Sequence, residues 1–362
     1  MANTRTFVGL DAHASQTQAA IIDFESGEIT FRRIAGDPLR SLEMLRGLRG
    51  PVRATYEAGP VGYGLARAGA AAGIEVRVCA PGSIPRKPGD KVKTDRRDAE
   101  RIVRQLIAGE LSFVRVPSPE EERCRDLARC REAVRGDLMR ARHRLSRFLV
   151  RHELRFEGPG AAWTEPHRRW LGQLVGEDAA MAAVLGDYLS GVQALSQRRS
   201  ALDQAIEEVW PQSPWSETVA RLRCFRGIGS LTAFGLCAEV GDFRRFERPG
   251  ALAGYLGIVP SEHSSGEVVR RGPITKAGSS FGRRLLIEAA HHYRRPPKIS
   301  AGIERRQRGQ DPRAVEIGWR CQQRLHRRWC RLRLERKRPS GVVITALARE
   351  LTSFVWEVGQ LR

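Results

Sequence analysis

Long apolar runs are missing from this sequence, and no stretch approaches the ~18–20 apolar residues that a membrane-spanning helix needs. A protein with transmembrane helices is therefore excluded. The amino terminus also lacks the pattern of a secretory signal, because it runs from Met1 directly into a strand-like segment. We therefore expect a protein of the cytoplasm.

Cysteines are few and scattered. The chain of 362 residues has seven, an odd number, and no two of them form a Cys-x-x-Cys pair. Structural zinc sites and disulfide frameworks use paired cysteines at short spacings. The sequence therefore disfavours both, and it favours reduced thiols in a reducing compartment.

Acidic residues are scarce relative to basic ones. The chain has 62 Lys and Arg against 41 Asp and Glu, a formal net charge of +21. Its 41% of hydrophobic and 28% of charged residues are ordinary for a globular protein, so wholesale disorder is excluded. An enzyme of small metabolites has little use for such a surplus of positive charge, whereas a DNA or RNA partner explains it.

The length favours two or three domains, and residues 1–112 are expected to form the first of them, an α/β domain. Three strands in succession are expected, joined as an antiparallel meander, followed by helix, strand, helix and strand. This order is that of a ribonuclease-H-like fold. A further helix is expected from Asp95 to about Ala108, with Thr94 as its N-cap. The expected strands and helices before it cover residues 6–10, 19–23, 29–34, 38–48, 52–57, 61–72 and 74–79.

Residues 113–213 are expected to form a domain of long helices. Apolar residues from Val134 to Phe148, and again from Met181 to Val209, recur in alternating steps of three and four, and Arg199 is the interruption. This spacing predicts a coiled-coil seam. It leaves open whether the seam joins two antiparallel helices of one subunit or helices of two subunits.

Residues 214–362 are expected to form a mainly helical domain. Near its start, two predicted helices are joined by the turn Gly227-Ile228-Gly229. The backbone N–H groups of Gly227 and Gly229 are placed to hold a nucleic-acid phosphate at the start of the second helix. A tight helix–helix turn without a ligand is the alternative.

The tail of this domain is strongly basic. Residues 294–338 carry a surplus of 12 positive charges, and Trp319 and Trp329 stand among the arginines. Basic residues interleaved with aromatic ones favour a nucleic-acid surface over a merely solvated face. The cations assigned to this surface are Arg324, Arg327 and Arg328.

Four acidic residues stand where the predicted fold would bring them together. Asp11 ends the first strand, Glu57 ends the fourth, and Asp95 and Asp98 share one face of a predicted helix. Carboxylates so close together repel one another, and divalent cations with oxygen ligands, Mg²⁺ or Mn²⁺, relieve that repulsion. Two such ions clamp a phosphodiester during strand cleavage. His13 is interpreted as a surface histidine, with a place in the pocket as the alternative.

A candidate nucleophile stands in the carboxyl-terminal half. Ser265 lies in Glu262-His263-Ser264-Ser265-Gly266, and clustered cations follow it. Cations suit the attack of a serine on a phosphate because they stabilise the charge on its oxygens. From these residues alone, a Ser-Ser-Gly turn without chemistry remains the stronger interpretation. The cations are Arg270, Arg271, Lys276, Arg283 and Arg284.

Over nearly its full length, the chain resembles the IS110 group of bacterial insertion-sequence transposases, including its IS1111 branch. The matching segments occur in the order of that family. They are V-G-L-D-A-H at Asp11, Y-E-A-G at Glu57, T-D-R-R-D-A at Asp95, F-R-G-I-G-S-L-T-A, L-A-G-Y-L-G-I-V-P, H-S-S-G, I-T-K-A-G, R-R-L-L, R-L-H-R-R and A-R-E-L-T-S-F-V-W.

The resemblance implies a RuvC-like domain with a DEDD metal site at Asp11, Glu57, Asp95 and Asp98, then a coiled-coil domain and a serine domain. It places the nucleophile on Ser265, with Ser264 adjacent. It also implies a structured bridge RNA that pairs with donor and target DNA. A dimer or tetramer joined through the helical domain would act at the bacterial nucleoid. Ser265 would attack a DNA phosphate, form a covalent phosphoserine and release a hydroxyl end.

Two other interpretations remain open. A RuvC-like junction nuclease would hydrolyse DNA with water and need no serine. A non-catalytic relic of a transposase would bind DNA or RNA without cutting. The four acids and the serine are intact in this chain, which argues against the relic.

Overall fold

The computed structural model describes residues 6–81, 94–176, 178–262 and 270–362. The chain divides into two compact units, an amino-terminal unit of residues Met1–Ser118 and a carboxyl-terminal unit of residues Pro119–Arg362. Each is described by itself below. Among the described helices, none combines the length and the apolar character needed to cross a bilayer.

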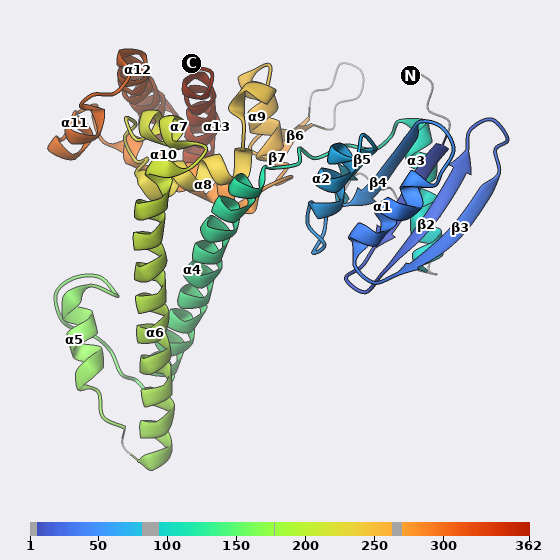
Figure 1. Cartoon of the computed structure of the whole chain (residues 1–362). Helices are drawn as coiled ribbons and strands as arrows, with labels where there is room; N and C mark the ends of the chain where they lie inside the picture. The colour runs from blue at the N-terminus through green and yellow to red at the C-terminus, as the bar shows by residue number, and fades with distance from the viewer. Residues whose placement is uncertain (1–5, 82–93, 177, 263–269) are drawn as a thin grey trace. The chain divides into compact units, whose positions relative to one another are not determined.

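The amino-terminal unit contains a five-stranded mixed sheet in the order β3-β2-β1-β4-β5 (Figure 1). The first three strands pair antiparallel, as the predicted meander requires, and β1, β4 and β5 run parallel. The prediction that the first and fourth strands are neighbours is therefore confirmed. The strands are β1 Thr6–Ala12, β2 Gln16–Asp23, β3 Ile29–Ala35, β4 Val52–Glu57 and β5 Glu75–Cys79.

Helices cover both faces of this sheet because β1 is a continuous apolar run, and its successive side chains point to opposite faces. Val8 and Leu10 pack in one core with the helices α1 (Ser41–Arg46) and α2 (Gly64–Ala71). Phe7 packs in the opposite core with α3 (Asp95–Ala108). Because successive side chains of a strand point to opposite faces, a run of apolar residues is buried on both sides of the sheet.

The helix α3 begins where the sequence predicts. The Thr94 hydroxyl accepts a hydrogen bond from the backbone N–H of Arg97, which caps the first turn. Asp95 and Asp98 lie in that first turn, where the helix dipole stabilises negative charge.

The carboxyl-terminal unit is mainly helical. Its main core joins residues from the start of α4 and the end of α6 to those of α7, α8, α10, α12 and α13. The elements are α4 Pro119–Arg151, α5 Glu165–Gln173, α6 Ala179–Val209, α7 Ser216–Leu222, α8 Ser230–Val240, α9 Pro249–Tyr255, β6 Pro260–Glu262, β7 Arg271–Ile274, α10 Ser280–Ala290, α11 Ala301–Gln307, α12 Pro312–Trp329 and α13 Ser340–Gly359.

The long helices α4 and α6 lie side by side and antiparallel within one chain, and together they form the helical arm of this unit (Figure 1). The apolar positions predicted from Val134 to Phe148 are all buried. On α6, however, most of the predicted seam is half-buried, and Leu185 and Ile206 are its buried members. Away from the main core, a second core forms around Leu145, Phe148 and Leu171 of α5.

Candidate metal centre and nucleic-acid surface

The sheet places two of the predicted acids at one edge. Leu10 of β1 pairs in parallel register with Tyr56 of β4, so the next residues, Asp11 and Glu57, lie at the same end of adjacent strands. The Asp11 carboxylate is half-buried, whereas Glu57 is exposed.

A glycine lets the other two acids approach. A Cβ at Gly9 would lie 2.3 Å from the Ala99 carbonyl oxygen and 2.6 Å from the Val103 nitrogen, both in the backbone of α3. The helix can therefore lie directly on β1 only because residue 9 has no side chain. This close approach brings the first turn of α3, with Asp95 and Asp98, to the end of β1.

Three possible ligands meet there. Oxygen atoms of Asp11 and Asp95 and a ring nitrogen of His13 all lie within 4.8 Å of one another. His13 is an exposed residue, as the surface interpretation expects, and its Nε2 lies 3.3 Å from an Asp11 carboxylate oxygen. The Asp98 carboxylate is 2.9 Å from the Arg101 guanidinium, and Glu57 lies outside the three-residue group.

The electrostatics of this group favour a bound cation. Burial raises the pKa of the Asp11 carboxyl, His13 opposes the rise, and the charges of Asp95 and Asp98 add to it. A cation placed among these groups would offset the burial of the Asp11 charge and the smaller repulsion from Asp95 and Asp98. Carboxylate oxygens suit Mg²⁺ and Mn²⁺, and an imidazole is better tolerated by Mn²⁺. The donor set thus fits the predicted divalent ion.

One residue of this site escapes motif analysis. Gln16 Nε2 donates a hydrogen bond to Asp95 Oδ2 at 3.0 Å, and Arg33 Nε donates to Gln16 Oε1 at 2.9 Å. Because arginine only donates, Arg33 fixes the amide of Gln16 with its N–H₂ toward Asp95. In the sequence, the signal is limited to the position of Gln16 at the start of the strand that pairs with β1.

The candidate nucleophile Ser265, together with Ser264 and His263, lies outside the described residues. The strands β6 and β7 flank this segment and pair antiparallel. Arg270 and Lys276, close in sequence, are exposed. Arg271 begins β7.

Two of the predicted cations take part in the internal structure. Arg283 donates two hydrogen bonds of 2.9 Å, to the carbonyl oxygens of Leu256 and Ala277. Arg284 pairs with Glu132 of α4 and Glu288 of its own helix, at 3.0 and 2.6 Å. Both guanidinium groups therefore connect segments of the fold.

The turn between α7 and α8 has the predicted Gly-Ile-Gly shape. Gly227 adopts a φ of +80°, and Gly229 is the N-cap residue of α8. The Ile228 side chain is buried in the main core, which fixes the turn. A Cβ on Gly229 would meet no atom within 4 Å, and the residue is half-buried.

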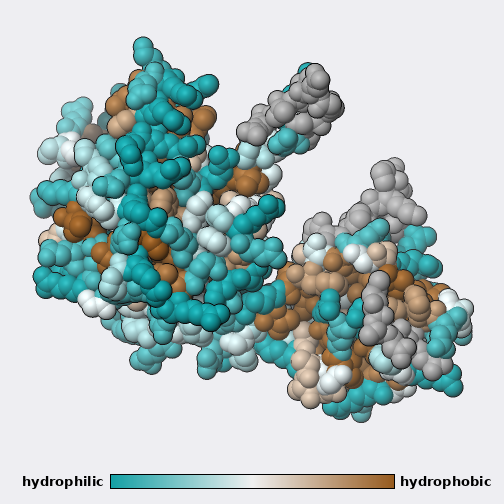
Figure 2. All heavy atoms as spheres, turned by 90° about the horizontal axis from the view of Figure 1, so that it is seen from above, coloured by the Kyte–Doolittle hydropathy of each residue, from teal (hydrophilic) through white to brown (hydrophobic). Residues whose placement is uncertain are grey.

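The basic tail forms part of a largely hydrophilic face of the carboxyl-terminal unit (Figure 2). Within it, Glu350 of α13 pairs with both Arg324 and Arg328 of α12, the latter at 3.0 Å. Arg327 is exposed. These pairs hold α12 against α13, so Arg324 and Arg328 are structural as well as basic.

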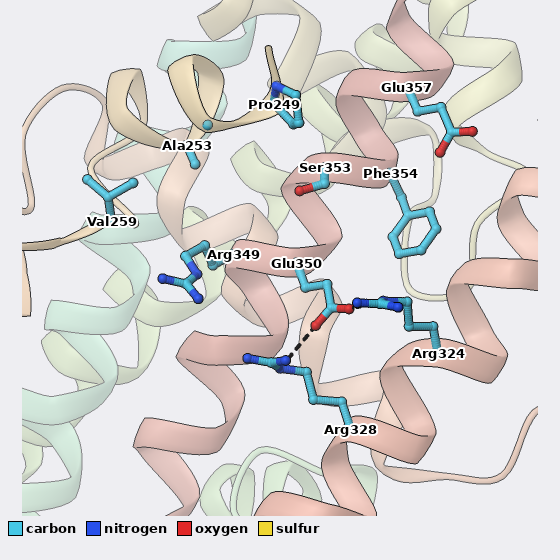
Figure 3. A pocket seen from close by; sticks show the side chains of 11 residues that line it. Pro249, Ala253, Val259, Arg324, Arg328, Arg349, Glu350, Ser353, Phe354 and Glu357 are labelled. Atoms are coloured by element: carbon cyan, nitrogen blue, oxygen red, sulfur yellow. Dashed lines mark hydrogen bonds and ion pairs between the residues drawn. The ribbon is translucent and has the colours of Figure 1, made fainter.

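A cavity of about 530 Å³ opens beside these pairs, lined by residues of α9, α12 and α13 (Figure 3). Val259, the residue before β6, lines it, so the cavity lies at the base of the hairpin that leads to the predicted serine. Arg349, which sequence analysis did not single out, is an exposed cation of the same cavity. In the sequence it stands in A-R-E-L-T-S-F-V-W, one of the segments that resemble the insertion-sequence transposases.

Comparison with known proteins gives two family matches. Residues 8–153 match a family described as a transposase with the name DEDD_Tnp_IS110, and residues 219–302 match one described as the transposase IS116/IS110/IS902 family. The first match contains the four predicted acids, and the second contains Gly227, Gly229 and Ser265.

Whole proteins are also similar. A putative transposase, y4qE, of Sinorhizobium fredii is 37% identical over 98% of this chain and 88% of its own length. The transposase for insertion sequence element IS1533 of Leptospira borgpetersenii is 31% identical over 92% of this chain and 98% of its own. The transposase for insertion sequence element IS1111A of Coxiella burnetii is 27% identical over 65% and 66%.

Proposed function

Since this chain belongs to the IS116/IS110/IS902 family of transposases, we propose that it cleaves and rejoins DNA to move an insertion sequence, with a divalent metal at Asp11 and Asp95. The convergence of these two carboxylates and His13 within 4.8 Å is the observation that carries the proposal. The sheet order β3-β2-β1-β4-β5 supports a RuvC-like, ribonuclease-H-like domain around them.

The acidic residues hold the cation against the DNA backbone. Bound Mg²⁺ or Mn²⁺ supplies Lewis-acid stabilisation of phosphate oxygens. Asp11 and Asp95 are its primary ligands, with Asp98 and Glu57 as the remaining acids of the DEDD set. Gln16 donates a hydrogen bond to Asp95 Oδ2 and would leave Oδ1 available to a cation.

Ser265 is the proposed nucleophile. Its hydroxyl oxygen attacks a DNA phosphorus, the bond to the leaving sugar oxygen breaks, and the released strand takes a proton as a hydroxyl end. The phosphoserine conserves the energy of the phosphodiester, so the strands rejoin without ATP. The cations near it in sequence, Arg270 and Lys276, support this role because exposed positive groups stabilise charge on the phosphate.

The partners are donor and target DNA and a structured bridge RNA that pairs with both. The net charge of +21 supports several polyanionic partners at once. A protein that holds nucleic acids by their backbones leaves sequence recognition to base pairing. Recombination joins two duplexes, so a dimer or tetramer through the helical arm is proposed as the active form.

Strand cleavage and protein–DNA adducts test the mechanism. The purified chain is incubated with Mg²⁺, with a supercoiled plasmid that carries the element's ends, and with an RNA transcribed from the element's flanking segment. Asp11→Asn and Asp95→Asn should each lower cleavage about a thousandfold, because several kcal/mol of charge stabilisation are lost. Glu43→Gln, an exposed acid on α1, is the matched control and should cleave normally.

Ser265 separates this mechanism from a junction nuclease that uses water. Ser265→Ala should abolish both cleavage and the covalent adduct, whereas Ser264→Ala should retain both. Full cleavage by Ser265→Ala would establish the hydrolytic nuclease instead. Cleavage by Asp11→Asn at the wild-type rate would refute the metal centre.

A further inference from the structure

Three arginines lie near one another on the helical arm and on α5, which shares the second core with it. Arg142 comes from α4, Arg168 from α5 and Arg199 from α6, and we call them the arm arginine cluster. Arg199 is the residue that interrupts the apolar seam of α6. A charged residue at such a position lowers the stability of a helix pair, so its presence suggests a role other than packing.

The cluster holds its guanidinium groups in place without neutralising them. The guanidinium carbon of Arg142 lies 4.8 Å from the ring centroid of Trp163, in a cation–π contact. The Nε atoms of Arg142 and Arg199 are buried. That of Arg142 has no hydrogen-bond partner among the described residues, and that of Arg199 lies 3.7 Å from Asp203 Oδ2, beyond hydrogen-bond distance. Buried donors of this kind are rare, because each costs the free energy of its lost hydration.

Positive charge dominates the surroundings. In the part of the chain that the structure describes, Asp203 supplies the only carboxylate paired with the cluster, 3.7 Å from Arg199. The other oxygen of Asp203 binds Arg131 at 2.6 Å, so this carboxylate is already engaged. Burial lowers the pKa of Arg142, and the charges of Arg199 and Arg168 lower it further.

We propose that the arm arginine cluster is a binding site for a backbone phosphate of a nucleic acid. Guanidinium forks match the oxygens of a phosphodiester, and an anion that reaches their outer N–H groups would balance the positive charge that Asp203 leaves uncompensated. Trp163 keeps the Arg142 group oriented before the ligand arrives. The inference rests on the proposed function only in taking the nucleic acid as the source of the anion.

Binding is measured on the full-length chain in EDTA, so that no cleavage occurs. The probes are a fluorescent 30-base-pair DNA duplex and a fluorescent 30-nucleotide RNA hairpin, titrated over a range of salt concentrations. The variants are Arg168→Gln, which is exposed and leaves the packing intact, and Arg199→Leu, which continues the apolar seam. Arg140→Gln is the matched control, because Arg140 is an exposed residue of α4 paired with Asp137.

Each cluster variant should weaken binding of at least one probe about tenfold and reduce the slope of log Kd against log salt by about one, whereas the control should change Kd less than twofold. Weaker binding of only one probe identifies whether DNA or RNA supplies the bound phosphate. Arg199→Leu should also raise the Tm of the free protein. Unchanged Kd for both probes, or a loss equal to that of Arg140→Gln, would overturn the site. That result would leave the proposed cleavage untouched, because cleavage is tested separately with the Asp11 variants.

Discussion

Glu239 shows how single residues hold the helical arm to the main core. This carboxylate of α8 is 5% exposed and accepts a hydrogen bond of 2.8 Å from Arg129 of α4. Burial alone would raise its pKa, but hydrogen bonds from Arg129 and Ser279 outweigh burial and hold the pKa below its ordinary value. A group with a depressed pKa stabilises the fold in its ionised form.

Glu239→Gln should therefore lower the free energy of unfolding by about 2 kcal/mol near pH 7, because a charge-assisted hydrogen bond is lost. The stabilising effect of Glu239 is present above its unfolded pKa of about 4.3 and disappears as the pH falls through the lower folded pKa. Urea unfolding at pH 7 and at pH 3 measures both ends of this range. Glu217→Gln, on a 79% exposed side chain, is the control and should change little. An equal loss at both pH values would contradict this explanation.

At the scale of elements, the turn between α7 and α8 depends on one of its two glycines. A Cβ at Gly227 would lie 2.7 Å from the Ala289 carbonyl oxygen, and the φ of +80° is unfavourable for any side chain. Gly229 has an ordinary φ of −95° and no atom near its missing Cβ.

Gly227→Ala should thus cost about 2 kcal/mol or more of stability, from backbone strain and from the shift of α10. Gly229→Ala should cost about 1 kcal/mol or less, since only the N-cap preference changes. Thermal unfolding of the two variants in parallel makes the comparison. Equal losses of stability would contradict the conclusion that the positive φ and the contact with α10 make Gly227 the more sensitive position.

Element order was accessible to sequence analysis, but side-chain partners were not. Short apolar runs separated by turns predicted the strands, and Thr94 marked the start of α3. By contrast, Arg284 donates a hydrogen bond to Glu132, a residue 152 positions earlier, and the local sequence does not predict that pair. The same holds for the hydrogen bond from Gln16 to Asp95, which depends on the tertiary fold, and for the one from Arg33 to Gln16.

For the whole molecule, the relevant feature is that each unit has its own cores. Among the residues that the structure describes, the fully buried clusters of the amino-terminal unit end at Leu111, and those of the carboxyl-terminal unit begin at Cys124. Chains with separate cores commonly unfold in more than one step. The metal centre belongs entirely to the first unit.

Calorimetry of the full chain should accordingly show two transitions, and Mn²⁺ should move only one of them. At about 100 times its dissociation constant, a ligand adds about 2.7 kcal/mol, or about 11 °C in Tm for a domain of this size. Asp11→Asn should abolish the shift. Equal movement of both transitions, or a full shift in Asp11→Asn, would contradict a metal site confined to this unit.

The missing side chain at Gly9 has a consequence for the inheritance of such a gene. Any replacement there pushes α3 away from β1, and the carboxylates separate although none of them has changed. A copy can thus lose its activity through a mutation at a residue with no chemical role. Intact acidic residues in a genome sequence are consequently not sufficient to distinguish a mobile copy from a silent one.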